Sequence, residues 1–222
     1  MAQSPELETT REYTDAERRA DHAIHLLGLG AAALAIPLMI FYAARWHGGS
    51  PVTVAALVYA ASLIATLGFS AAYHMTERPD LSDWLRRGDH AAIYAAIAGA
   101  YTPVVILHGG PSTGPMLVLL WCCAAAGMTL KIAWPRRWDG LAVLFYVAMG
   151  WSAVIVGGPV LEGLTDQGFL LILAGGILYT VGVIFYLWES LPFQNAIWHG
   201  FVLTATAMIF TAILNELSAA AV

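Results

Sequence analysis

The chain has 222 residues, of which 59% are hydrophobic and only 11% are charged, and its mean hydropathy is +0.69. Soluble domains carry roughly a quarter charged residues, so this composition excludes an ordinary soluble protein and predicts one that is built for lipid. The net charge of −5 comes largely from acidic residues near the N terminus, and no basic patch indicates a nucleic-acid partner.

The N-terminal segment 1–20 is acidic and lacks the basic region and apolar core of a cleavable signal peptide. We expect it to be a cytoplasmic, partly disordered tail before a membrane domain at 21–218. Apolar stretches long enough to cross ~30 Å of hydrocarbon then follow in chain order, at 23–44, 52–74, 90–108, 114–133, 139–157, 168–187 and 196–217. The short gaps between them predict an all-α bundle of seven antiparallel transmembrane helices.

Basic residues are unevenly distributed among the predicted loops. Nine of the ten lie in the N-terminal tail or in the loops on the same side of the bundle, namely Arg11, Arg18, Arg19, Arg78, Arg86, Arg87, Lys131, Arg136 and Arg137. Only Arg45 falls in a loop on the opposite side. The positive-inside rule therefore places the N terminus in the cytoplasm and the C terminus, after seven crossings, outside.

Several polar side chains fall at the predicted inner ends of the helices. The second span ends with Ser70 and His74, which are four residues apart and so share one helix face. Asp89 begins the third span, and Asn195 and His199, again four apart, begin the seventh. Polar groups in membrane helices are costly and become candidates for function. The topology places these five at similar depth near the inner surface.

Zinc accepts imidazole nitrogen and carboxylate oxygen, so an ion between His74 and His199 would join the second and seventh helices. Asp89 would bind that ion directly, or hold its water and act as a general base, and Ser70 would orient the water or a substrate carbonyl. The alternative is structural. In that case the two histidines form an interhelical hydrogen bond, while Asp89 and Asn195 cap their helices. The spacing leaves both interpretations open.

The other five histidines fall near the two membrane surfaces. We interpret His22, His25 and His90 as solvated side chains at the depth of the inner headgroups, where an imidazole costs little. His47 and His108 fall at the far interface, and we interpret both as incidental.

The motifs that contain these residues resemble a known family. They are the run from Ser70 to His74, the run Asp89-His-Ala-Ala-Ile-Tyr94 with Tyr101-Thr102-Pro103, the run from Ala196 to Leu203, and Glu17 and His25 before the first helix. Together they look like the hemolysin III family, the bacterial branch of the progestin and adipoQ receptor (PAQR) group. The resemblance spans about Glu17 to Leu214 and is specific as a combination.

This resemblance implies a seven-helix fold in a bacterial cell membrane, with a cytoplasmic N terminus and a zinc ion near the inner face. His74 and His199 match zinc ligands of the family. Asp89 matches the carboxylate that holds the water of the zinc, and Ser70 matches the serine beside the site. Membrane lipids are the partners that this family implies.

The chain also departs from the family pattern. Asn195 stands where the first histidine of helix 7 is expected, Ile209 replaces a further histidine, and Asp21 stands where asparagine is common. The amide oxygen of Asn195 is a weaker zinc ligand than imidazole, so direct ligation by Asp89 or an approach by His25 would complete the set.

Three hypotheses follow. The first is a zinc-dependent hydrolase of lipid amides or esters, which rests on resemblance to lipid-hydrolysing relatives. The second is a non-catalytic membrane sensor or regulator of lipid composition, in which the polar cluster only joins helices. Asn195 in place of histidine favours this second reading. A cytolytic protein ranks last, because it follows only from the family name.

Overall fold

The computed structural model describes residues 13–110, 113–137 and 139–221, and all of the regular structure in these segments is helical. The predicted tail at 1–20 therefore lies mostly outside the described residues. In chain order the helices are α1 (Asp15–His47), α2 (Pro51–Met75), α3 (Pro79–His108), α4 (Thr113–Ala133), α5 (Asp139–Gly150), α6 (Ser152–Val156), α7 (Gly158–Gly163), α8 (Asp166–Leu187) and α9 (Gln194–Ala219).

Six of the described helices, α1, α2, α3, α4, α8 and α9, are long and apolar enough to cross a membrane. The structure thus confirms an all-helical membrane protein. The fifth predicted span, 139–157, is not one continuous helix, because α5 ends at Gly150 and α6 begins at Ser152. Trp151 forms the break with φ −90° and ψ 2°, a conformation outside the regular helix.

Two helices begin earlier than their apolar stretches. The first begins at Asp15, eight residues before the predicted span, because Thr14 and Glu17 form a reciprocal capping box. The third begins at Pro79, so most of the segment between the second and third predicted spans is helical. Proline is common in the first turn of a helix, because the N–H that it lacks would have no hydrogen-bond partner within the helix at that position. Hydropathy locates the lipid-crossing part of a helix and not its polar extension.

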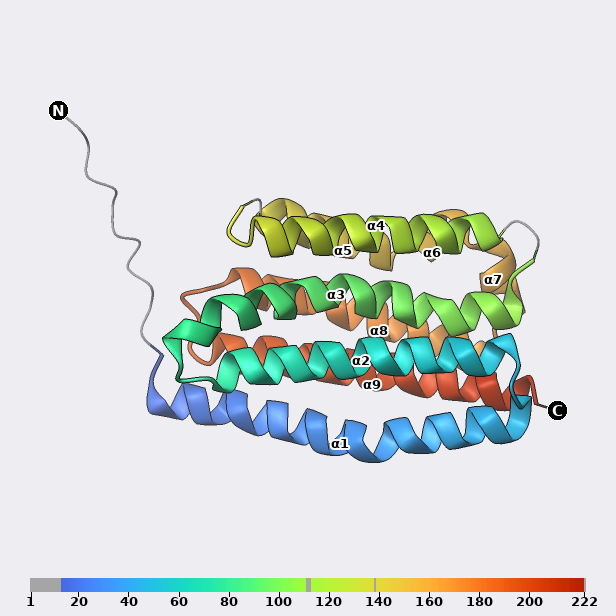
Figure 1. Cartoon of the computed structure of the whole chain (residues 1–222), viewed down its shortest axis with the longest axis horizontal. Coiled ribbons are helices and arrows are strands. Elements are labelled where there is room, and N and C mark those ends of the chain that lie inside the picture. Colours follow the sequence, from blue (N-terminus) through green and yellow to red (C-terminus); the bar gives the residue numbers. More distant parts are fainter. Residues whose placement is uncertain (1–12, 111–112, 138, 222) are drawn as a thin grey trace.

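The helices form a bundle in which α3 contacts α2, α4, α5, α7 and α9 (Figure 1). The first helix packs against α2 and α9, and α8 packs against α9. Many of the buried residues at these contacts are small, such as Ala56, Ala98, Ala124 and Ala212, all with no measurable exposure. Small side chains let helix backbones approach closely, which is how helices associate in lipid.

Large apolar side chains such as Leu34 and Ile155 are exposed on the outside of the bundle, where lipid would cover them. Figure 1 shows that the starts of α1, α3 and α9 and the end of α2 gather at one end of the bundle, on the left of the view. This end carries the polar residues considered next.

Candidate metal centre

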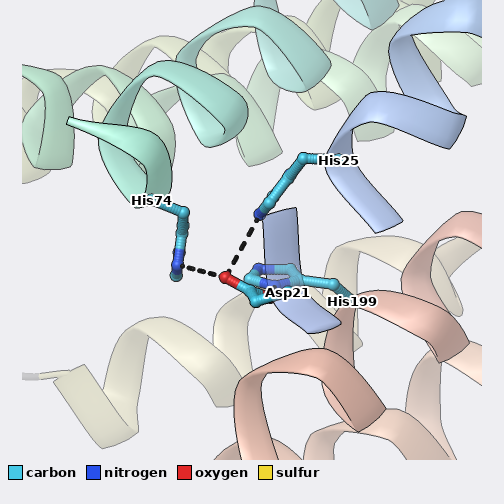
Figure 2. A group of neighbouring side chains, drawn as sticks. All are labelled: Asp21, His25, His74 and His199. Carbon is cyan, nitrogen blue, oxygen red and sulfur yellow. Dashed lines mark hydrogen bonds and ion pairs between the residues drawn. The ribbon is translucent and has the colours of Figure 1, made fainter. Parts of the chain in front are cut away.

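Four side chains from three helices meet at this end of the bundle (Figure 2). They are Asp21 and His25 of α1, His74 of α2 and His199 of α9, and one nitrogen or oxygen atom from each lies within 4.8 Å of the others. Asp21, His25 and His199 are buried, and His74 is partly buried. Within the described chain this is the one group of three or more acidic, histidine or cysteine side chains close enough to hold a metal ion.

Local sequence explains how α1 presents its two members. Asp21 and His25 are four residues apart and therefore lie on one face of the helix, one turn from each other. Glu17 lies a further turn back on the same face. Its Oε2 caps the helix by accepting the N–H of Thr14 at 2.8 Å, and its Oε1 accepts the N–H of Phe193 at 2.9 Å. Phe193 is the residue before α9, so Glu17 holds the starts of α1 and α9 together.

The Asp21 carboxylate is at the centre of the group. Its Oδ1 lies 2.6 Å from Nδ1 of His199, and its Oδ2 lies 3.1 Å from Nδ1 of His74. Nε2 of His25 is 3.6 Å from Oδ2 of Asp21, which is too long for a hydrogen bond. The three imidazole rings lie close together, with centroid separations of 4.4 to 5.1 Å.

The donor set suits a metal ion of the zinc type. Three imidazole nitrogens and one carboxylate oxygen are ligands that zinc accepts, and four is its usual coordination number. A second observation supports the fit: Nε2 of His25 is buried and has no hydrogen-bond partner among the described residues. A buried polar atom without a partner is costly, and a bound cation would satisfy it.

Asp89 and Ser70 lie beside this group. Asp89 is buried well inside α3, and the hydroxyl of Ser70, on α2, hydrogen-bonds its carboxylate. Asp89 interacts electrostatically with His74 and His25, so its carboxylate lies near the cluster, but it is not one of the four residues of the group. The idea that Asp89 caps a helix is wrong, because α3 begins ten residues earlier at Pro79.

Asn195 lies one turn before His199, half-buried in the first turn of α9. It does not cap that helix either, since the N-cap position belongs to Phe193. Phe193 has a φ of 59°, a left-handed conformation that is uncommon for a bulky residue and lets the chain turn sharply from α8 into α9. The contribution of Asn195 to metal binding stays a prediction.

The sequence interpretation missed Asp21 as a candidate ligand and named His25 of α1 only as an alternative to Asp89 that would complete the set. His25 is buried in the cluster rather than solvated at the headgroups. His22 also points inward, with its Nε2 3.2 Å from the carbonyl oxygen of His74. A signal was present: Asp21 and His25 have the same four-residue spacing as Ser70 and His74. This spacing was overlooked because residues 21 to 25 lie at the start of the predicted apolar span and were interpreted as a surface segment. In the structure α1 begins earlier, at Asp15, so these residues lie within the helix.

Comparison with known proteins gives a consistent result. Residues 19–210 match the model of a family described as haemolysin-III related. The chain belongs to the hemolysin III family. It is 40% identical to "Hemolysin-3" of Bacillus cereus over 199 residues, which cover 89% of this chain and 90% of the relative. It is 35% identical to "Hemolysin-3 homolog" of Bacillus subtilis (strain 168), with 91% of this chain and 95% of the relative covered.

A more distant relative of this hemolysin III protein is the human "Monocyte to macrophage differentiation factor". It is 29% identical over 194 residues, which cover 86% of this chain and 69% of the relative. The family match includes all four members of the histidine and aspartate group, as well as Ser70 and Asp89. The predicted family is thereby confirmed, and the candidate metal centre lies within the family domain.

Proposed function

We propose that this hemolysin III protein is a zinc-dependent hydrolase of lipid amides or esters. The observation that carries the proposal is the convergence of Asp21, His25, His74 and His199 from three helices into one buried group. Only a compact bundle brings these residues together, since positions 21 and 199 lie at opposite ends of the sequence. Buried polar side chains inside a membrane protein are energetically costly, so a cluster of them indicates a functional site.

In this proposal His74, His199 and Asp21 would hold the zinc ion, with His25 as a fourth ligand, and catalysis would use the fifth coordination position that zinc can add in the transition state. Asp21 takes the place that the amide of Asn195 would otherwise fill. This arrangement is favoured because a carboxylate is a better zinc ligand than an amide oxygen. When bound, zinc supplies a Lewis acid that polarises a carbonyl and lowers the pKa of water.

Asp89 is the proposed general base. Its carboxylate lies next to the group and accepts a hydrogen bond from Ser70, so it is oriented to hold a water molecule beside the site. Asp89 takes a proton from this water as the oxygen attacks the substrate carbonyl, and it then returns the proton to the leaving nitrogen or oxygen. The products are a carboxylic acid and an amine or alcohol.

We further infer the placement in the membrane. The chain crosses the bilayer seven times, with α5 and α6 together forming the fifth crossing. The N terminus, and with it the metal centre, faces the cytoplasm. Eight basic residues of the described chain support this orientation. Seven lie on α1, α3, α4 or the turn after α4 near this end, and Arg78 directly precedes α3, while Arg45 lies near the other end of α1. The bacterial relatives favour the inner membrane as the location. At this depth the site would meet the polar linkages of a lipid.

Purified protein tests the proposal. We expect about one zinc ion per chain, and release of fatty acid from a panel of lipid amides and esters that is lost in His199→Ala and after metal removal, and restored when zinc is returned. Arg45→Gln, at the other end of α1, serves as a control that retains activity. Turnover that survives both His199→Ala and removal of the metal would reject the mechanism.

One observation favours the alternative, a non-catalytic sensor or regulator of lipid composition. Asp21 contacts His199 at 2.6 Å and His74 at 3.1 Å directly, so the group can join α1, α2 and α9 through its own polar contacts. This alternative predicts that His74→Ala lowers thermal stability while no zinc is found in wild type. Stoichiometric zinc in the purified protein would argue against it.

A further inference from the structure

A shallow hollow of about 290 Å³ lies at the end of the bundle that carries the metal centre, between the start of α3 and the turn that follows α4. It does not include any of the four candidate ligands. The lining residues are Asp83, Arg87, Ala133, Trp134, Pro135, Arg136 and Arg137. The lining thus contains three arginines and one aspartate, so the hollow has an excess of positive charge.

The only acidic residue among the described residues that line the hollow, Asp83, already forms an ion pair. Asp83 is paired with Arg136 at 2.8 Å. The neighbouring Asp139 lies outside the hollow and is already paired with Lys131 and Arg86.

Arg87 has neutral partners. Its Nη1 donates to the carbonyl oxygen of Ile132 at 2.5 Å, and its guanidinium lies 5.0 Å from the ring centroid of Trp84. A guanidinium has five N–H donors, so the one carbonyl leaves donors and the full charge of Arg87 for an anion.

The surroundings indicate what kind of anion would fit. The hollow lies where α4 ends and Trp134 follows it, half-exposed, which is the usual depth of tryptophan at a membrane interface. Directly before it on α4, Leu130 and Ile132 are also exposed. A ligand bound here would therefore find guanidinium groups beside an apolar helix surface that faces lipid. A water-soluble anion would leave that apolar surface unused.

We propose that this hollow binds the phosphodiester headgroup of an anionic phospholipid, with the acyl chains along the exposed face of α4. Arginine is suited to this role because its planar fork matches phosphate oxygens in a bidentate manner. Basic pockets at the ends of membrane helices hold anionic headgroups by the same combination of charge and depth. This binding does not depend on the proposed hydrolase activity, since none of the lining residues belongs to the metal centre.

The test uses the full-length protein in detergent, titrated with phosphatidylglycerol or phosphatidylcholine, with bound lipid counted by native mass spectrometry. The variant Arg136→Gln/Arg137→Gln removes two exposed charges from the hollow. Arg18→Gln/Arg19→Gln removes two exposed charges from neighbouring positions on α1 and is the matched control. We expect the first pair to lower phosphatidylglycerol affinity about tenfold and the control less than about twofold, with no change for phosphatidylcholine.

A second variant protects the test against misfolding. Arg87→Lys keeps the charge but removes the planar guanidinium that can bind phosphate through two N–H groups, so we expect phosphatidylglycerol affinity to fall about threefold. The melting temperature of the variant checks that it is folded. An equal loss in both double variants would overturn the proposal, because it would indicate general surface attraction. Displacement of the lipid by inorganic phosphate at equal concentration would also overturn it, because the site would then bind phosphate without requiring a lipid.

Discussion

The two ends of the bundle each hold a buried carboxylate next to histidine, three residues at one end and one at the other, and the two carboxylates have different partners. At one end Asp21 contacts side-chain nitrogens of His74 and His199, and His25 lies nearby with an unpartnered nitrogen. At the other end Glu216 of α9 is completely buried beside His108, whose Nε2 lies 2.7 Å from Oε2 of Glu216. Residue types alone would have made these two clusters look alike.

The donors around Glu216 come mostly from a helix start. Thr165, the N-cap of α8, donates its N–H at 3.2 Å and its hydroxyl at 2.6 Å to Oε1 of Glu216. The same threonine oxygen accepts the N–H of Gly168 and the amide of Asn215. A carboxylate near a helix N-terminus is stabilised by the N–H groups and the dipole there. Glu216 therefore has the partners of a structural residue that joins α3, α8 and α9.

The comparison separates a structural cluster from the candidate metal centre. Around Glu216, hydrogen-bond donors from the backbone and from a hydroxyl satisfy the acid. Around Asp21, the neighbouring groups are imidazole nitrogens of histidines from three helices, the atoms that a metal ion would use. The interpretation of His108 as incidental is wrong, because the pairing with Glu216 fixes the end of α3.

The largest expected effect is the loss of metal affinity in His199→Ala. Removal of a residue that hydrogen-bonds a metal ligand typically lowers metal affinity roughly 10–100-fold. Loss of a direct ligand should therefore lower it more than about 1000-fold. His108→Ala removes an imidazole from the Glu216 cluster and should leave zinc affinity unchanged. Zinc titration with a competing chelator measures both. Equal affinity in His199→Ala and wild type would erase the distinction between the two ends.

Glu216→Ala should produce the next largest effect, on stability alone. It leaves the Thr165 and His108 donors buried without an acceptor, which should lower the free energy of unfolding by about 3 kcal/mol. The exposed Glu162→Ala is the matched control and should stay within about 0.5 kcal/mol of wild type. Denaturant unfolding in mixed micelles gives these values. A large loss of zinc in Glu216→Ala would contradict the proposed separation of roles.

A pair of exchanges sharpens the assignment of Asp21. Asp21→Asn replaces the carboxylate ligand by a weaker amide oxygen with little change in volume, so zinc affinity should fall about 100-fold, less than in His199→Ala because the amide oxygen still offers a weak ligand. Adding Asn195→His in the same chain supplies an imidazole one turn before His199, so affinity should return to within about threefold of wild type. Metal analysis measures both variants. Stoichiometric zinc in Asn195→His but none in wild type would mean that the natural chain has lost its metal centre.

The smallest expected effect concerns the cap that positions α1. Thr14→Ala removes the side chain that accepts the N–H of Glu17, which should cost about 1 kcal/mol of stability. Because Glu17 also holds the turn before α9, zinc affinity should fall by a few-fold, as for the loss of an outer partner. Thr204→Ala, an exposed threonine bonded within its own helix, is the control and should alter neither quantity.

Hydropathy predicted most of the fold because a membrane-crossing helix needs about 20 apolar residues, which is a property of each segment alone. It failed where local geometry decides. The break at Trp151 lies between Gly150 and Ser152, but membrane helices commonly contain such small residues, so they did not indicate a break. The early start of α3 was missed because residues 79 to 88 are polar, although Pro79 favours a helix start.

The sequence by itself determined that this protein is helical and membrane-embedded, that it belongs to its family, and that His74 and His199 come from helix ends on the same side of the bundle. These follow from segment composition, the order of crossings and short motifs.

Only the tertiary structure decided which side chains meet. The direction of a side chain around a helix axis depends on how that helix packs against its neighbours, so the place of Asp21 and His25 in the group was fixed by the contacts of α1 with α2 and α9.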